Sequence, residues 1–125
     1  MPRTLALLML CALCVACSDA AAPVPEPDAA EWQVTGRGSD QGGEFCAAFD
    51  LSAMQVRSFF ARARRITAEQ LHDHDWLPCY VRGTTVSAKR TGSWEIRAGG
   101  TARIEWKDGV AEIFVCTECD DLLKD

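Results

Sequence analysis

The amino-acid sequence predicts an α+β fold, in which one amphipathic helix packs on an antiparallel meander of four or more strands cross-linked by disulfides. Apolar residues recur at helical spacing from Leu51 to Ile66, and short segments separated by glycine turns follow from about Tyr80 to Cys116. Four cysteines fall in the same part of the chain. A chain of 125 residues, 48% of them hydrophobic, has room for one domain.

The N-terminal 16 residues have the composition of an export signal. Arg3 is their only cation, and an unbroken apolar segment runs from Leu5 to Ala16. At about 12 residues this segment is too short to cross a bilayer as a helix, which takes about 20. The sequence therefore predicts a signal peptide at residues 1–16.

Cys17 follows the apolar segment directly. Val15-Ala16-Cys17 resembles the lipobox of bacterial lipoproteins, although Cys14 stands where leucine is usual. The resemblance covers about the first 17 residues. It implies that Cys17 becomes the lipidated first residue of the mature chain, and several acyl chains on one residue give stable anchoring in the membrane.

The same resemblance indicates a location in the cell envelope. Ser18 would be the second mature residue and Asp19 the third, an order that favours the outer membrane, with the domain facing the periplasm. An ordinary cut near Ala20 to Ala22 would instead give a soluble secreted protein, and an uncleaved anchor is the third alternative.

The segment after Cys17 is interpreted as a tether. Residues 17–31 are rich in Ala and Pro, carry acidic residues and no cation, and lack hydrophobic periodicity. Such a segment is an extended spacer of about 3.1 Å per residue. Residues 32–125 are therefore expected to form the single globular domain.

A helix is predicted within Leu51 to Ile66. Ser52 and Gln55 form a capping-box pattern, which marks its start. The apolar positions at three- and four-residue spacing are Val56, Phe59, Phe60, Ala63 and Ile66. The surface arginines Arg57, Arg62, Arg64 and Arg65 are interpreted as a solvated face, because the chain has a net charge of −5 and export removes it from nucleic acid.

Three hairpins are predicted in the meander. Asp108-Gly109 reads as a two-residue turn, which sets Trp106 opposite Ala111 and Ile104 opposite Ile113. A three-residue loop from Ala98 to Gly100, with Gly100 left-handed, sets the pairs Trp94–Ile104, Ile96–Ala102 and Glu95–Arg103. A loop of the same length from Arg90 to Gly92 sets the pairs Ala88–Trp94 and Val86–Ile96.

These registers place the apolar residues on one face, which the helix is expected to cover. Further strands are expected at Glu44 to Asp50 and near Trp32 to Gly36. The opposite face is expected to be polar and wet, with Thr85, Ser87, Glu95, Arg97, Arg103, Glu105 and Glu112. Within it, the candidate binding face consists of Glu95, Arg97, Arg103 and Glu105.

The cysteines of the domain are Cys46, Cys79, Cys116 and Cys119. In an exported protein this even set predicts two disulfides with three possible pairings, and Cys46 with Cys79 and Cys116 with Cys119 is the favoured one. Two alternatives use the Cys116-x-x-Cys119 motif, as a thiol-disulfide redox site or as half of a zinc site. The acidic neighbours Glu118, Asp120 and Asp121 oppose the thiolate that redox chemistry needs.

Sequence motifs for catalysis are weak. His72-Asp73-His74-Asp75 is interpreted as a polar loop, and no nucleophile, phosphate-binding, metal or cofactor fingerprint is recognised elsewhere. The sequence therefore favours a non-enzymatic lipoprotein whose domain binds another envelope or exported protein, as an envelope accessory factor or as an inhibitor or immunity-type protein. The alternative is a redox or zinc protein that uses Cys116 and Cys119.

Overall fold

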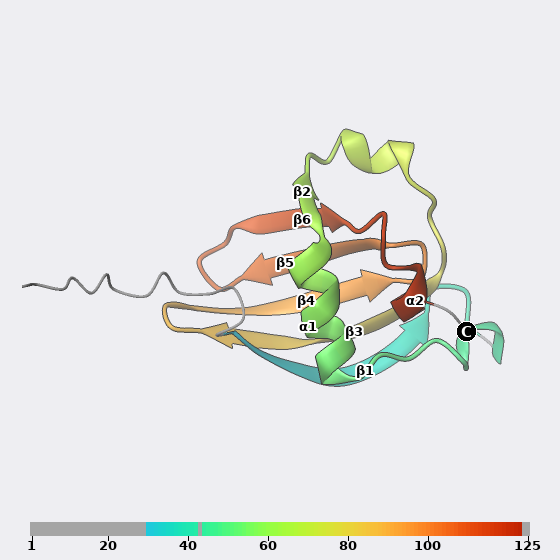
Figure 1. Ribbon diagram of the computed structural model, residues 1–125, viewed down its shortest axis with the longest axis horizontal. Helices are drawn as coiled ribbons and strands as arrows, with labels where there is room; N and C mark the ends of the chain where they lie inside the picture. The colour runs from blue at the N-terminus through green and yellow to red at the C-terminus, as the bar shows by residue number, and fades with distance from the viewer. Residues whose placement is uncertain (1–29, 43, 124–125) are drawn as a thin grey trace, which may run out of the picture.

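A computed structural model describes residues 30–42 and 44–123 of the chain, and the predicted signal peptide, Cys17 and most of the tether lie outside this range. Six strands form one antiparallel sheet in the order β1-β3-β4-β5-β6-β2 (Figure 1). The strands are β1 (Glu31–Ser39), β2 (Arg64–Ile66), β3 (Cys79–Ser87), β4 (Arg90–Arg97), β5 (Thr101–Trp106) and β6 (Ala111–Val115). The helices are α1 (Ala53–Arg62) and α2 (Asp120–Leu123), with short 3-10 turns η2 (Glu44–Cys46) and η3 (Gln70–Asp73). The α+β prediction is confirmed.

Helix α1 starts where the sequence predicts. The Ser52 hydroxyl accepts a hydrogen bond from the Gln55 backbone N–H at 3.2 Å, and the Gln55 side chain accepts one from the Ser52 N–H at 2.8 Å. These two bonds satisfy donors that the first helical turn leaves free.

The end of α1 differs from the prediction. The helix stops at Arg62, Ala63 is extended, and Ile66 belongs to β2. Arg62 donates two hydrogen bonds to the Asp121 carboxylate, at 2.7 and 3.2 Å, and these bonds raise the pKa of Arg62. Ile66 is buried and lies opposite Ile113 of β6. Its helical spacing from Ala63 gave no sign that it belongs to a strand.

The core lies between α1 and the sheet. Val56 and Phe59 of the helix are fully buried. Phe60 stacks on Trp32 of β1, with ring centroids 4.6 Å apart and planes within 7°. Its edges meet Trp94 at 6.3 Å and Phe114 at 5.5 Å. The helix therefore covers one sheet face, as predicted, and aromatic packing fixes its position.

The β4–β5 hairpin has the predicted register. Trp94 lies opposite Ile104 and Glu95 opposite Arg103. The Gly100 N–H donates to the Arg97 carbonyl at 2.9 Å, and Gly100 has a positive φ of 97°. The three-residue loop is thus the predicted one.

The predicted β3–β4 register is wrong. Strand β3 continues to Ser87 and turns through two residues, so that Gly83, and not Ala88, lies opposite Trp94. A Cβ at Gly83 would lie 2.5 Å from Trp94 Cζ2, and therefore this indole needs a glycine beneath it. The five-residue shift turns Thr85 and Ser87 towards the helix side and leaves Val86 47% exposed.

The predicted β5–β6 register is off by one residue. Trp106 donates its N–H to the Val110 carbonyl at 2.9 Å around a three-residue loop in which Gly109 has a φ of 93°. Ile104 therefore lies opposite Glu112, and Arg103 lies opposite Ile113. Glu112 lies on the helix side, because Arg65, Arg90 and the Trp106 indole all bind its carboxylate there.

The two earlier strand predictions have different outcomes. The strand near Trp32 to Gly36 is part of β1, the edge strand beside β3. The segment from Glu44 to Asp50 is not a strand. The Ala47 N–H bonds the Glu44 carbonyl and the Asp50 side chain caps the Leu51 N–H, both at 2.9 Å. Local turns therefore satisfy backbone groups that a strand would have paired.

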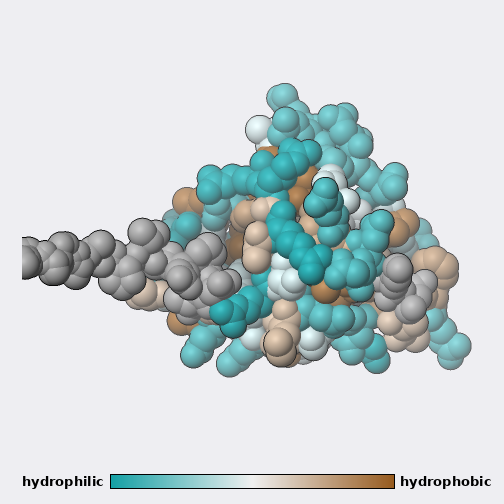
Figure 2. Space-filling model, viewed as in Figure 1, coloured by the Kyte–Doolittle hydropathy of each residue, from teal (hydrophilic) through white to brown (hydrophobic). Residues whose placement is uncertain are grey.

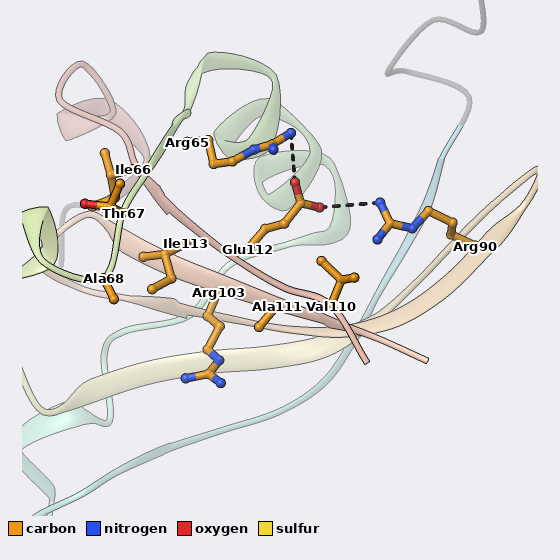
Figure 3. A pocket seen from close by; sticks show the side chains of 10 residues that line it. All are labelled: Arg65, Ile66, Thr67, Ala68, Arg90, Arg103, Val110, Ala111, Glu112 and Ile113. Carbon is orange, nitrogen blue, oxygen red and sulfur yellow. Dashed lines mark ion pairs between the residues drawn. The ribbon is translucent and has the colours of Figure 1, made fainter. Parts of the chain in front are cut away.

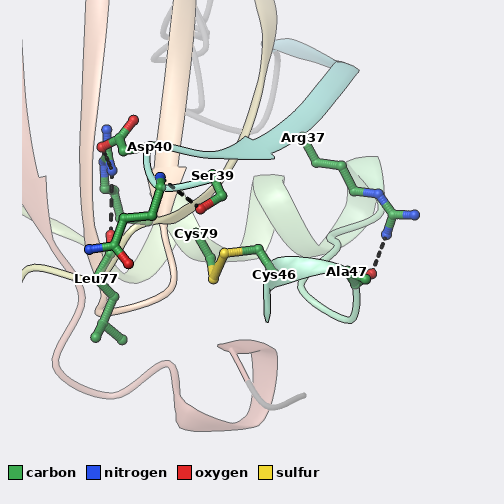
Figure 4. Close-up of a disulfide and its surroundings, with 9 residues drawn as sticks. Arg37, Ser39, Asp40, Cys46, Ala47, Leu77 and Cys79 are labelled. Atoms are coloured by element: carbon green, nitrogen blue, oxygen red, sulfur yellow. Dashed lines mark hydrogen bonds and ion pairs between the residues drawn. A yellow bond between two sulfur atoms is a disulfide. The ribbon is translucent and has the colours of Figure 1, made fainter. Parts of the chain in front are cut away.

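Both disulfides have the favoured pairing. Cys46–Cys79 joins η2 to the start of β3, with its Cα atoms 5.2 Å apart (Figure 4). Cys116–Cys119 closes the turn between β6 and α2, with its Cα atoms 5.6 Å apart.

Candidate functional site

The sheet face opposite α1 carries the candidate binding residues. Glu95 and Arg97 alternate with buried Trp94 and Ile96 on β4, and Arg103 and Glu105 alternate with Ile104 on β5. All four therefore lie on one face, as the sequence predicts for them. We call this surface the open face, and the β3 side chains Arg82 and Thr84 also belong to it. Thr85, Ser87 and Glu112, which were expected here, lie on the other side.

Arg82 is the main residue that sequence reasoning missed. In the register of the structure it lies beside Glu95, which in turn lies beside Arg103, so that a row of three charges crosses three strands. The error in the β3–β4 loop hid this row. An alternation count anchored on Trp94 and Gly83 would have found it.

A shallow groove of about 300 Å³ lies over this row of charges. We call it the sheet groove. Its polar lining consists of Thr35, Arg82, Thr84, Ser93, Glu95, Arg103 and Glu105. Hydroxyl groups and charges of both signs thus stand side by side on a rigid sheet, an arrangement that suits polar recognition of a second molecule.

Arg97 differs from the other charges of the open face. Its guanidinium pairs with Asp40 at 2.6 Å and with Glu95 at 2.8 Å, and it lies 5.4 Å from the Trp76 ring and 5.3 Å from the Tyr80 ring. Its side chain is only 19% exposed. Arg97 therefore holds the loop before β3 and the end of β1 against the sheet, and its charge is used within the domain.

Arg82 and Arg103 are the accessible cations of the open face. Arg82 stacks on the Tyr80 ring at 4.3 Å, and no carboxylate within residues 30–42 and 44–123 forms an ion pair with it. Arg103 pairs with Glu105 at 3.0 Å, and both side chains are more than half exposed. Exposed pairs of this kind contribute little to stability, and both cations can therefore turn towards a ligand.

A second groove, of about 620 Å³, lies at the β6 edge of the sheet (Figure 3). We call it the edge groove. Its charged lining is Arg65, Arg90, Arg103 and Glu112, and its apolar lining is Ile66, Ala68, Val110, Ala111 and Ile113. Arg103 lines both grooves, so the edge groove continues the open face around the side of the sheet.

The helix side offers a different surface. Figure 2 shows mainly hydrophilic residues on this side, with hydrophobic residues in separate small areas. The Arg62 and Arg65 side chains pair with Asp121 and Glu112. This side therefore resembles the solvated surface that the sequence predicts for the helix.

The cysteines are poorly placed for redox chemistry. Cys119 is fully buried and Cys116 is 6% exposed. Thiol exchange requires an attacking thiolate to reach a sulfur atom. The second cysteine of the motif, rather than the first, adjoins α2, and this four-residue helix begins with Asp120 and Asp121, whose charges disfavour a thiolate.

Within residues 30–42 and 44–123, no group of three or more His, Cys, Asp and Glu side chains is arranged to hold a metal ion. His72 lies in η3, and His74 follows it in an extended conformation. None of the helices in these ranges is long and apolar enough to cross a membrane.

The fold and the grooves together define a class: a small α+β domain, cross-linked by two disulfides, with a helix on one sheet face and polar side chains on the other. Comparisons with protein-family models, with curated proteins and with solved structures find no match to this chain.

Proposed function

We propose that this chain is an exported lipoprotein, anchored through Cys17, whose domain binds another envelope or exported protein and does not catalyse a reaction. The observation that carries the proposal is the open face. One side of the sheet is covered by α1, whereas the other presents Arg82, Thr84, Arg103 and Glu105 to solvent from adjacent strands.

The residue types on this face support a protein partner. Arginine and aromatic side chains are enriched at the centres of protein interfaces, and Arg82 already rests on Tyr80. The strands hold these groups in place before binding, which reduces the conformational entropy that binding would otherwise cost.

The predicted location supports the same proposal. A lipid on Cys17 and an Ala- and Pro-rich tether would hold the domain near the outer membrane, facing the periplasm. Envelope accessory factors and inhibitors or immunity-type proteins work from this position, and both bind protein partners through complementary charge.

The test is photo-crosslinking in cells, followed by mass spectrometry of the adduct. A photoreactive residue replaces Thr84 on the open face, and the same residue replaces Met54, which is exposed on α1. We expect a defined protein adduct from position 84 alone. Equal adducts from both positions, or no adduct from position 84, would overturn the proposal.

A charge-reversal pair makes the test specific. Arg82→Glu with Arg103→Glu should abolish the adduct. Lys89→Glu with Lys107→Glu should preserve it, since this control changes the net charge by the same amount at two exposed turns. An adduct that survives the first pair would exclude the open face.

A further inference from the structure

We infer that the partner presents an extended segment with an acidic side chain, which adds to the sheet at the β6 edge in line with β2. This inference rests on the proposed function and deepens it, because it names the surface and the chemistry of the partner. It is carried by an open position in the strand ladder, by an apolar lining beside that position and by a lining that contains three arginines and one carboxylate.

Strand β2 covers only part of β6. Arg64 pairs with Val115 and Ile66 with Ile113, and the pairing ends there. In an antiparallel ladder, alternate residues direct their N–H and C=O groups to opposite neighbours. Val110 and Cys116 bond towards β5, through Trp106 and Gly100. Ala111, Ile113 and Val115 therefore point the other way, and no strand of the described chain pairs with Ala111 on that side.

Local hydrogen bonds keep this position open. Thr67, whose backbone groups point away from β6, starts a turn: its N–H donates to the Gln70 side chain at 2.9 Å and its hydroxyl accepts from the Gln70 N–H at 3.1 Å. Its carbonyl accepts from the Leu71 N–H at 3.2 Å. The chain thus turns into η3 instead of extending along β6. The gap is therefore set by hydrogen bonds within the chain, and Ala68, the residue in line with Ala111, belongs to the turn.

The side chains around Ala111 suit an extended peptide. Ile66 and Ala68 line the gap, together with Ile113 of β6 and Val110, which directly precedes β6. Val110 is 50% exposed. A strand opposite Ala111 would exchange two backbone hydrogen bonds and place its alternate side chains against these apolar groups.

The charges around the groove favour an acidic side chain. Arg65, Arg90 and Arg103 line it, and Glu112 is its only carboxylate. Glu112 is 11% exposed and binds Arg65 at 2.9 Å and Arg90 at 3.5 Å. Its single negative charge can neutralise only one of the three arginines in the lining. Asp108 and Glu105 pair with Arg90 and Arg103 from outside, and both are at least half exposed. Three arginines against one carboxylate in the lining itself thus favour an acidic side chain of the partner.

The probe is a blocked peptide, Thr-Val-Glu-Val-Thr, compared with the same peptide carrying Lys in place of Glu. Both are titrated into the full chain, labelled with ¹⁵N and held in detergent, while amide shifts are recorded. We expect the largest shifts at Ala111, Ile113 and Thr67, and binding at least tenfold tighter for the Glu peptide. No binding at millimolar peptide, equal binding of both peptides, or shifts centred on β1 would overturn the inference.

Two sets of variants separate the backbone contribution from the charge contribution. Ala111→Pro removes the outward N–H and should weaken the Glu peptide tenfold or more, whereas Ala111→Val keeps the N–H and should bind within a few-fold of the parent. Arg65→Gln with Arg103→Gln keeps the backbone and should remove the preference for Glu over Lys, even if the proline variant is poorly folded. Retention of that preference would overturn the charge argument.

The same variants distinguish the two proposals. If the photo-adduct from position 84 survives in a folded Ala111→Pro variant, the partner binds the open face without adding to the β6 edge, and only the further inference fails. If the adduct is absent in the parent chain as well, the proposed function itself fails.

Discussion

Replacing Arg97 with methionine should separate structural charges on the open face from accessible ones. Methionine keeps the volume of the stem but removes the guanidinium. The change deletes the ion pairs to Asp40 at 2.6 Å and to Glu95 at 2.8 Å, together with the stacking of the cation between Trp76 and Tyr80.

The expected loss follows from these contacts. A hydrogen bond to a charged group contributes about 1.5–3 kcal/mol, and the partial exposure of both carboxylates reduces this to about 1 kcal/mol each. The cation–π contacts add about 0.5–1 kcal/mol. The free energy of unfolding should therefore fall by about 2–3 kcal/mol, which for a domain of this size lowers the melting temperature by about 10–20 °C.

Urea unfolding, followed by tryptophan fluorescence, measures this loss. Arg103→Met is the matched control, because its pair with Glu105 is exposed on both sides and should contribute no more than about 0.5 kcal/mol. If Arg97→Met costs as little as Arg103→Met, the role of Arg97 as a clamp between β4 and the loop before β3 is refuted.

Three further predictions concern the disulfides, the sheet and the anchor. Replacing Cys46 and Cys79 by serine should cost about 3–4 kcal/mol, against about 1.5–2 for Cys116 and Cys119, because the closed loops span 33 and 3 residues; denaturant titration of the two double variants compares them. Gly83→Ala should prevent β1 from pairing with β3, since the new Cβ would lie 1.8 Å from the Gln33 carbonyl oxygen, and loss of amide protection throughout β1 would report it. Cys17→Ser should leave an unprocessed or soluble product in place of an acylated one, and intact mass after membrane fractionation decides between these results.

The register of the β4–β5 hairpin could be predicted because the two possible loop lengths place different residues opposite each other. A two-residue loop would have set Ile96 opposite Arg103, whereas the three-residue loop kept apolar residues together, and the structure has the latter. In the β3–β4 hairpin both registers offered apolar partners. The deciding contact, Trp94 lying over Gly83, depends on the size of a side chain and not on its polarity.

The edge groove could not be predicted, because its central carboxylate breaks the usual pattern. Glu112 follows Ala111 in a short strand and reads as a solvent-facing residue. Its partners Arg65, Arg90 and Trp106 come from β2, β4 and β5, and no local spacing indicates that they meet. Ile66 was also assigned wrongly from local spacing, because its helical spacing gave no indication that it belongs to β2.

The position of β1 bears on how the domain would carry mechanical load. A pull applied at residue 30 acts along β1, whose ladder to β3 runs from Glu31 to Ser39, so that its hydrogen bonds are sheared together instead of being unzipped one at a time (Figure 1). If β1 did detach, the Cys46–Cys79 bond would stop extension at residue 46, and the sheet from β3 to β6 would remain assembled with the edge groove, to which β1 contributes no residue. Under tension, the domain would thus lengthen by one strand while the edge groove kept its whole lining.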